Sequence, residues 1–132
     1  MSILINENTN VIVQGVTGRD GSFHARQMVG DGTKIVAGVT PGKGGQKLDE
    51  IPVYDSVGDA MKDHKVDATV IFVPPKFASG AIREAADAGV PLIICITEGM
   101  PVLEMVENYR YVKEKGLRLI GPNCPGLISP GK

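Results

Sequence analysis

The feature that most constrains this chain is a short β-branched run followed by three regularly spaced glycines and a segment that can form a helix. Val11 to Val13 have the composition of a buried strand. Gly15, Gly18 and Gly21 come next, and residues 22–29 are expected to continue as a helix. Glycine lets the backbone approach a ligand closely, and a helix N-terminus offers unpaired N–H groups and the positive end of its dipole. The arrangement suits a diphosphate, and a tight turn without a ligand is the alternative.

The spacing of these glycines does not by itself identify a nucleotide. It reads Gly-x-x-Gly-x-x-Gly, whereas the dinucleotide fingerprint is Gly-x-Gly-x-x-Gly. Thr17-Gly18-Arg19-Asp20 also fits a capping box, with Thr17 as N-cap and Asp20 bonding back to it. A purely structural role for these residues therefore stands beside the phosphate-binding one.

Length, charge and cysteine content exclude several classes of protein. The 132 residues are enough for one domain, 1–132, and too few for two. No apolar run is long enough to span a bilayer, and the first residues do not resemble a signal peptide. The net charge of -1 gives no electrostatic basis for binding nucleic acid or an anionic membrane. Cys95 and Cys124 are expected to be free thiols in a reducing compartment, so we expect a cytoplasmic protein.

Segments typical of strands alternate with segments typical of helices. Strands are expected at 11–13, 34–39, 51–54, 68–73, 92–96 and 117–120, and helices at 22–29, 56–61, 76–88 and 101–115. Residues 40–46 are expected to form a loop. The last helix is expected to bury an apolar stripe of Val102, Met105, Val106, Tyr109 and Val112. The alternation predicts an α/β fold, a doubly wound, mainly parallel, Rossmann-like sheet with strand order 3-2-1-4-5 and a sixth strand beyond.

In such a sheet the ligand lies beyond the carboxyl ends of the strands. The segments expected at those ends are 15–20, 39–45, 73–75, 96–98 and 121–126, most of them rich in glycine or proline. They are expected to converge on one crevice.

The end of the second strand bears on the kind of nucleotide that is bound. Dinucleotide-binding sheets usually carry an acidic residue there to hold the ribose hydroxyls. This chain instead has Val39-Thr40, followed by Lys43. A lysine suits a phosphate on the ribose, which both NADP and coenzyme A carry, and Arg19 could add a second positive charge. The alternatives are a solvated Lys43 and an Arg19 that only pairs with Asp20.

No catalytic residues and no metal site are predicted. His24 is expected at the surface or in packing, His64 in solvent and Cys95 in the core. Cys124 follows Asn123 in a loop at the expected ligand edge, but no histidine is placed beside it to activate the thiol.

Four segments carry a resemblance to a known family: Gly15-Val16-Thr17-Gly18, Val39-Thr40-Pro41-Gly42-Lys43-Gly44-Gly45, Ile96-Thr97-Glu98-Gly99-Met100-Pro101 and Gly121-Pro122-Asn123-Cys124-Pro125-Gly126. Together they resemble the N-terminal CoA-binding domain of the α subunit of succinyl-CoA synthetase (succinate–CoA ligase, ADP- or GDP-forming), an enzyme of the tricarboxylic acid cycle. The similarity covers essentially the whole chain and implies coenzyme A as the cofactor.

The resemblance also implies a role for each matching position. The loop of Gly15 and Gly18, with Thr17, Arg19 and Asp20, would hold the CoA phosphates, and Lys43 would bind the nucleotide end. The remaining positions would follow the cofactor toward its thiol: Val39, Pro41, Val73 and Pro74 beside adenosine and pantetheine, Ile96, Thr97 and Glu98 along the site, and Asn123 and Cys124 near the thiol end.

The chain departs from the family in what it lacks. The family's α subunit continues into a domain that carries a phosphorylated histidine, and it works with a β subunit. The full enzyme interconverts succinate, CoA and a nucleoside triphosphate with succinyl-CoA, the diphosphate and phosphate. Neither His24 nor His64 matches that histidine, so the chain alone is expected to bind CoA without catalysis and, as an isolated domain, to be able to self-associate. An NADP-binding module and a stand-alone CoA-sensing domain are the alternatives.

Overall fold

The computed structural model describes residues 9–96 and 101–120. Strands and helices alternate through this part of the chain. The strands are β1 (Val11–Gln14), β2 (Ile35–Val39), β3 (Lys47–Leu48), β4 (Ile51–Tyr54), β5 (Ala68–Ile71), β6 (Leu92–Cys95) and β7 (Arg118–Ile120), and the helices are α1 (Arg19–Gly30), α2 (Val57–Asp63), α3 (Pro75–Asp87) and α4 (Val102–Glu114).

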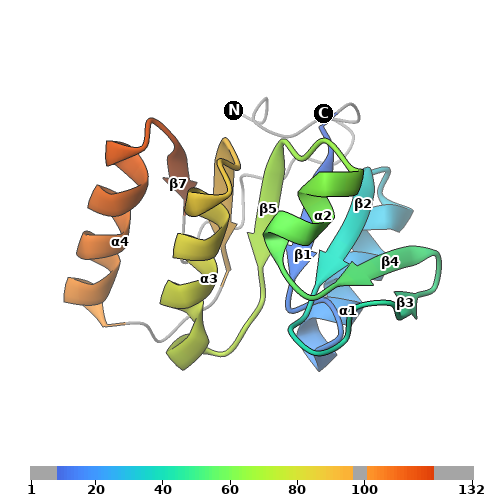
Figure 1. Ribbon diagram of the computed structural model, residues 1–132. Helices are drawn as coiled ribbons and strands as arrows, with labels where there is room; N and C mark the ends of the chain where they lie inside the picture. Colours follow the sequence, from blue (N-terminus) through green and yellow to red (C-terminus); the bar gives the residue numbers. More distant parts are fainter. Residues whose placement is uncertain (1–8, 97–100, 121–132) are drawn as a thin grey trace.

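The strands form one sheet in the order β3-β4-β2-β1-β5-β6-β7 (Figure 1). All neighbours from β4 to β7 are parallel. Counted without β3, this is the order that the sequence predicted, so the Rossmann-like fold is confirmed. The two-residue β3 was not predicted: it pairs antiparallel with β4, where Lys47 lies opposite Pro52.

The helices cover the two faces of the sheet unequally. Helices α2, α3 and α4 lie on the face turned toward the viewer in Figure 1, and α1 lies behind the sheet. Strand β1 shows why both faces need cover: Ile12 belongs to the core beneath α2, α3 and α4, whereas Val11 and Val13 belong to the clusters on the face of α1. Continuous apolar strands of this kind are typical of a parallel sheet buried on both sides.

The start of α1 differs from the sequence prediction. Gly18, not Thr17, is the N-cap, and no side chain of a described residue caps the helix. The Thr17 hydroxyl is instead 3.1 Å from the Thr40 hydroxyl. The predicted capping box is therefore wrong, because Thr17 bonds across to the loop after β2.

The predicted apolar stripe of α4 is also only partly buried. Met105 and Val112 are buried, whereas Val102 is 77% exposed and Val106 and Tyr109 are exposed too. Between the buried pair lies Asn108, fully buried against α3, where its amide donates to the Ser79 hydroxyl and accepts from Arg83. The helix turns its Met105–Asn108–Val112 line inward because the amide has partners there, and this removes the cost of burying it. Pro101 is the N-cap of α4 and not its first residue.

The ends of α2 and α3 are stabilised by ordinary capping, and the core position predicted for Cys95 is confirmed. Ser56 caps α2 by accepting from the Asp59 N–H at 3.1 Å, and Gly89 follows α3 at φ +85°. Cys95 is buried in the core. Of the helices within the described ranges, none has the length and apolar content that a bilayer crossing needs.

Candidate functional site

The carboxyl ends of four parallel strands meet at one edge of the sheet. Gln14 is in register with Val39 on one side and with Ile71 on the other, and Ile71 is in register with Cys95. The loops after these strands therefore start side by side, along the lower edge in Figure 1. This is the edge at which the sequence places its ligand site.

The turn after β1 is held tightly between β2 and β5. The Gly15 N–H donates to the Val39 carbonyl at 2.8 Å, with φ +84° at Gly15. A Cβ at Gly15 would lie 3.1 Å from Val73 Cγ1 and 3.2 Å from the Phe72 carbonyl carbon. Both the backbone angle and the space favour glycine here.

Helix α1 begins directly after this turn and packs on it. A Cβ at Gly21, in the first helical turn, would lie 2.1 Å from the Gly15 carbonyl oxygen. Thr17, Gly18 and Arg19 are exposed at this N-terminus. With no described side chain at the cap, the first-turn N–H groups and the positive end of the helix dipole face the edge of the sheet.

The loop after β2 carries Lys43 at the same edge. Thr40 starts the loop, and its N–H donates to the Tyr54 carbonyl at 2.9 Å. The Lys43 N–H donates to the Thr40 carbonyl at 3.0 Å, and the Lys43 side chain is exposed. Lys43 makes no ion pair with any described residue. The contact of Thr17 with Thr40 joins this loop to the N-terminus of α1.

The ends of β5 and β6 complete the described edge. Val73 is half-buried beside Gly15, and the exposed Pro74 is the N-cap of α3. Ile96 is half-buried, and its N–H donates to the Ile71 carbonyl at 3.2 Å. Val39 is buried and Pro41 is exposed.

The structure thus brings together the predicted site residues that it describes, and the other predicted site residues lie outside the described ranges. Gly15, Thr17, Gly18, Arg19, Val39, Pro41, Lys43, Val73, Pro74 and Ile96 lie at or next to one edge, with Asp20 in the first turn of α1. Thr97, Glu98, Asn123 and Cys124 lie outside the described residues.

Asp55 and His24 also lie at this edge, and neither was predicted as a site residue. Asp55 follows β4, and its carboxylate accepts hydrogen bonds from the loop of Lys43. His24 stacks on Phe72 with ring centroids 5.0 Å apart, so the expected surface or packing position of His24 is confirmed. The signal that the sequence does offer is the position of Asp55 directly after the predicted strand 51–54.

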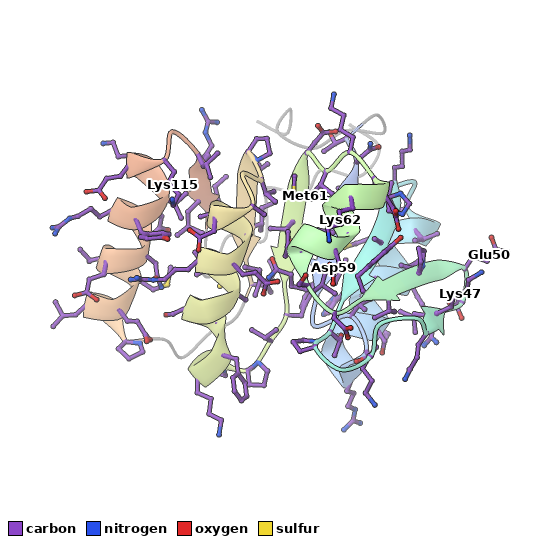
Figure 2. The ribbon with its side chains drawn as sticks, in the orientation of Figure 1. Lys47, Glu50, Asp59, Met61, Lys62 and Lys115 are labelled. Carbon is purple, nitrogen blue, oxygen red and sulfur yellow. The ribbon has the colours of Figure 1, made fainter. Side chains whose placement is uncertain are left out.

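A cleft of about 450 Å³ lies beside this edge, between the β3–β4 hairpin and α2. Its lining includes Gly44, Tyr54, Asp59 and Lys62 but none of the predicted site residues that the structure describes. Figure 2 shows Asp59 and Lys62 on the outward side of α2 and Lys47 at the outer end of the hairpin. The Tyr54 hydroxyl donates to Asp63 at 2.9 Å, and burial first and this hydrogen bond second raise the pKa of Tyr54.

With this geometry in place, comparison with known proteins identifies the family. Residues 6–99 match the family described as the CoA binding domain. The chain belongs to the CoA-binding domain family. The predicted resemblance is confirmed, and the match favours coenzyme A over the NADP alternative.

Two curated relatives extend the likeness of this CoA-binding domain over all of its residues. It is 58% identical over 132 residues to succinate–CoA ligase [ADP-forming] subunit alpha 2 of Archaeoglobus fulgidus, covering 46% of that protein. It is 52% identical over 134 residues to the corresponding subunit alpha of Aquifex aeolicus, covering 44% of it. The chain therefore spans about half the length of the curated relatives it matches.

A solved structure shows the same fold. The dinucleotide-forming acetyl-coenzyme A synthetase 1 of Ca. Korarchaeum cryptofilum, in its apo form, superposes with a TM-score of 0.74 over 93% of this chain and 29% of its own, at 25% identity.

Proposed function

We propose that this chain binds coenzyme A at the carboxyl edge of its sheet, as the CoA-binding domain of a succinate–CoA ligase α subunit. The observation that carries the proposal is the 58% identity to such a subunit over the full chain, together with the family match. The convergence of the glycine turn, the α1 N-terminus and the Lys43 loop on one edge supports it, because these features suit a phosphorylated ligand.

The proposed roles are those that the family resemblance implies for these positions. The N-terminus of α1, with Gly15, Thr17, Gly18, Arg19 and Asp20, would receive the diphosphate through backbone N–H groups. Lys43 would bind the 3′-phosphate of the ribose as a point charge. The other predicted residues would line the path of adenosine and pantetheine: Val39, Pro41, Val73, Pro74, Ile96, Thr97, Glu98, Asn123 and Cys124.

In the longer α subunit, this chain would be one domain, and a second domain would carry the phosphohistidine. This α subunit would work with a β subunit in the cytoplasm. The ligase reaction would then be a property of that assembly, and this chain would contribute CoA binding. If the chain acts instead as a stand-alone CoA sensor, it will not co-purify with a β-type subunit from cells that express both.

Calorimetric titration with CoA, dephospho-CoA and NADP tests the proposal. A hydrogen bond to a charged group contributes about 1.5–3 kcal/mol. Since Lys43 is exposed, we expect Lys43→Ala to weaken CoA binding by about tenfold, near the lower limit of that range. Dephospho-CoA, which lacks the 3′-phosphate, should be almost unaffected.

The matched control is Lys47→Ala, which removes the same charge from β3, the strand that follows the loop of Lys43, at the outer end of the β3–β4 hairpin (Figure 2). It should bind both ligands like the wild type. A folded wild-type chain that binds NADP more tightly than CoA, or does not bind CoA at all, would refute the proposed function. Equal losses for CoA and dephospho-CoA in Lys43→Ala would refute only the role of Lys43.

A further inference from the structure

The loop that carries Lys43 is built around one carboxylate oxygen. Asp55 Oδ1 accepts from the Gly42 N–H at 3.0 Å and from the Gly44 N–H at 2.9 Å. These glycines are the two neighbours of Lys43 in the chain. A single oxygen atom therefore fixes the backbone on both sides of the lysine.

The rest of the loop is held by the backbone of β4, the strand that Asp55 follows. The Thr40 N–H donates to the Tyr54 carbonyl, and the Gly45 N–H donates to the Val53 carbonyl at 3.0 Å. Gly42 and Gly45 have φ of +82° and +91°, which lets the chain turn tightly between these anchors. Residues 41–44 lie between these two backbone anchors, and the Asp55 carboxylate ties this middle part to the sheet.

The carboxylate and Gly44 fit closely. A Cβ on Gly44 would lie 2.8 Å from Asp55 Cγ and Oδ2 and 2.9 Å from Oδ1. Any side chain at Gly44 would therefore displace the carboxylate from its two N–H donors. Asp55 makes no ion pair with Lys43, so it holds the loop without neutralising the lysine.

We propose that Asp55 is the positioning residue for Lys43: by accepting from the Gly42 and Gly44 N–H groups, it holds the loop in the conformation that presents the lysine to the ribose phosphate of the bound ligand. The proposal rests on the proposed function, since it assumes a phosphorylated ligand at this edge. Asp55 itself does not touch the ligand. Its effect on affinity is transmitted through the position of Lys43.

The readout is the ratio of the Kd for dephospho-CoA to the Kd for CoA, measured by calorimetry on the full chain. This ratio isolates the contribution of the 3′-phosphate. A general loss of structure would weaken the binding of both ligands and leave the ratio unchanged. Asp55→Ala should lower the ratio by about fivefold, equivalent to about 1 kcal/mol. Asp55→Asn should keep a ratio near that of the wild type, because the amide oxygen can accept from the same two N–H groups.

Two further variants separate positioning from a structural effect. Gly44→Ala should lower the ratio as Asp55→Ala does, yet have little effect when combined with Asp55→Ala, since the obstructing carboxylate is then gone. In a Lys43→Ala background, Asp55→Ala should have no further effect on the ratio. Asp59→Ala, which removes a nearby carboxylate outside this loop, is the control and should leave the ratio unchanged.

The outcomes distinguish this proposal from the one it rests on. If the wild type does not bind CoA, the proposed function fails and this inference fails with it. If the wild type binds CoA and discriminates against dephospho-CoA, but Asp55→Ala and Gly44→Ala keep that discrimination, only the positioning role is overturned. A loss in Asp55→Asn equal to that in Asp55→Ala would also overturn it. If Asp55→Ala does not fold, Gly44→Ala decides the matter alone.

Discussion

Gly21 is the glycine whose replacement has the most definite consequence. It lies in the first turn of α1, where a Cβ would be 2.1 Å from the Gly15 carbonyl oxygen and 2.9 Å from the Gly15 carbonyl carbon. The separation between this Cβ and the carbonyl oxygen is about 1 Å shorter than a normal van der Waals contact. Both atoms belong to the backbone of the turn after β1, which is itself hydrogen-bonded to Val39. Neither side can yield without moving α1 away from the sheet.

The expected cost of Gly21→Ala follows from two opposing terms. Overpacking against a fixed neighbour costs about 1–3 kcal/mol, and contact with backbone places this site at the upper end of that range. Alanine recovers about 1 kcal/mol through its better helix propensity. We therefore expect a net destabilisation of about 2 kcal/mol, a large share of the roughly 5–15 kcal/mol that stabilises a typical domain.

Guanidinium denaturation followed by circular dichroism measures this change. Gly80→Ala is the matched control, because Gly80 lies within α3 and a Cβ there would meet nothing within 4 Å. It should stabilise the chain by up to about 1 kcal/mol. Glycine-to-alanine substitution should thus lower the free energy of unfolding in α1 and raise it in α3. If Gly21→Ala proves as stable as the wild type, the close packing of α1 on the Gly15 turn is wrong.

Two further predictions concern polar contacts. Thr69→Val keeps the shape of a buried side chain but leaves Gln14 Oε1, which accepts from the Thr69 hydroxyl at 2.8 Å, without that partner. Urea denaturation should show that the free energy of unfolding falls by about 1–3 kcal/mol. An unchanged midpoint would contradict the buried hydrogen bond. The hydrogen bond from the Tyr111 hydroxyl is the largest of the influences that lower the pKa of Asp87, so Tyr111→Phe should raise this pKa toward its ordinary value of 3.8 in a carboxyl NMR titration. Because the pKa is lowered in the folded state, the stabilisation from Asp87 is present above pH 3.8 and is lost as the pH falls through the folded-state pKa. An Asp87 pKa that is the same in the wild type and in Tyr111→Phe would refute the role of this hydrogen bond.

The sheet order could be predicted from the sequence because it depends on local signals that agree with one another. Apolar runs such as Val11 to Val13 and Leu92 to Cys95 alternate with helix patterns, and right-handed crossovers leave few ways to arrange them. The position of Lys43 at the carboxyl edge followed from the same topology.

What could not be predicted depends on contacts between segments distant in the sequence. The exposed side of α4 was misjudged because Asn108 takes a core position that its bonds to Ser79 and Arg83 make tolerable. The cap of α1 was misjudged because Thr17 bonds to Thr40, 23 residues away. Asp55 was missed because a carboxylate that accepts from glycine N–H groups leaves no periodic pattern in the sequence.

The two ends of the sheet bear on how copies of this chain behave when they are crowded together. Within the described residues, the strands at the two ends of the sheet are β3, with two residues, and β7, with three, so each offers another molecule few unpaired backbone groups. The charged Lys47 and Arg118 are exposed on these strands, and short, charged edges discourage strand addition and the aggregation that follows from it. Val102 and Leu103, 77% and 78% exposed at the start of α4, are by contrast open to apolar contact. Association between copies is therefore expected to involve contacts between helices, without pairing between the strands of different copies.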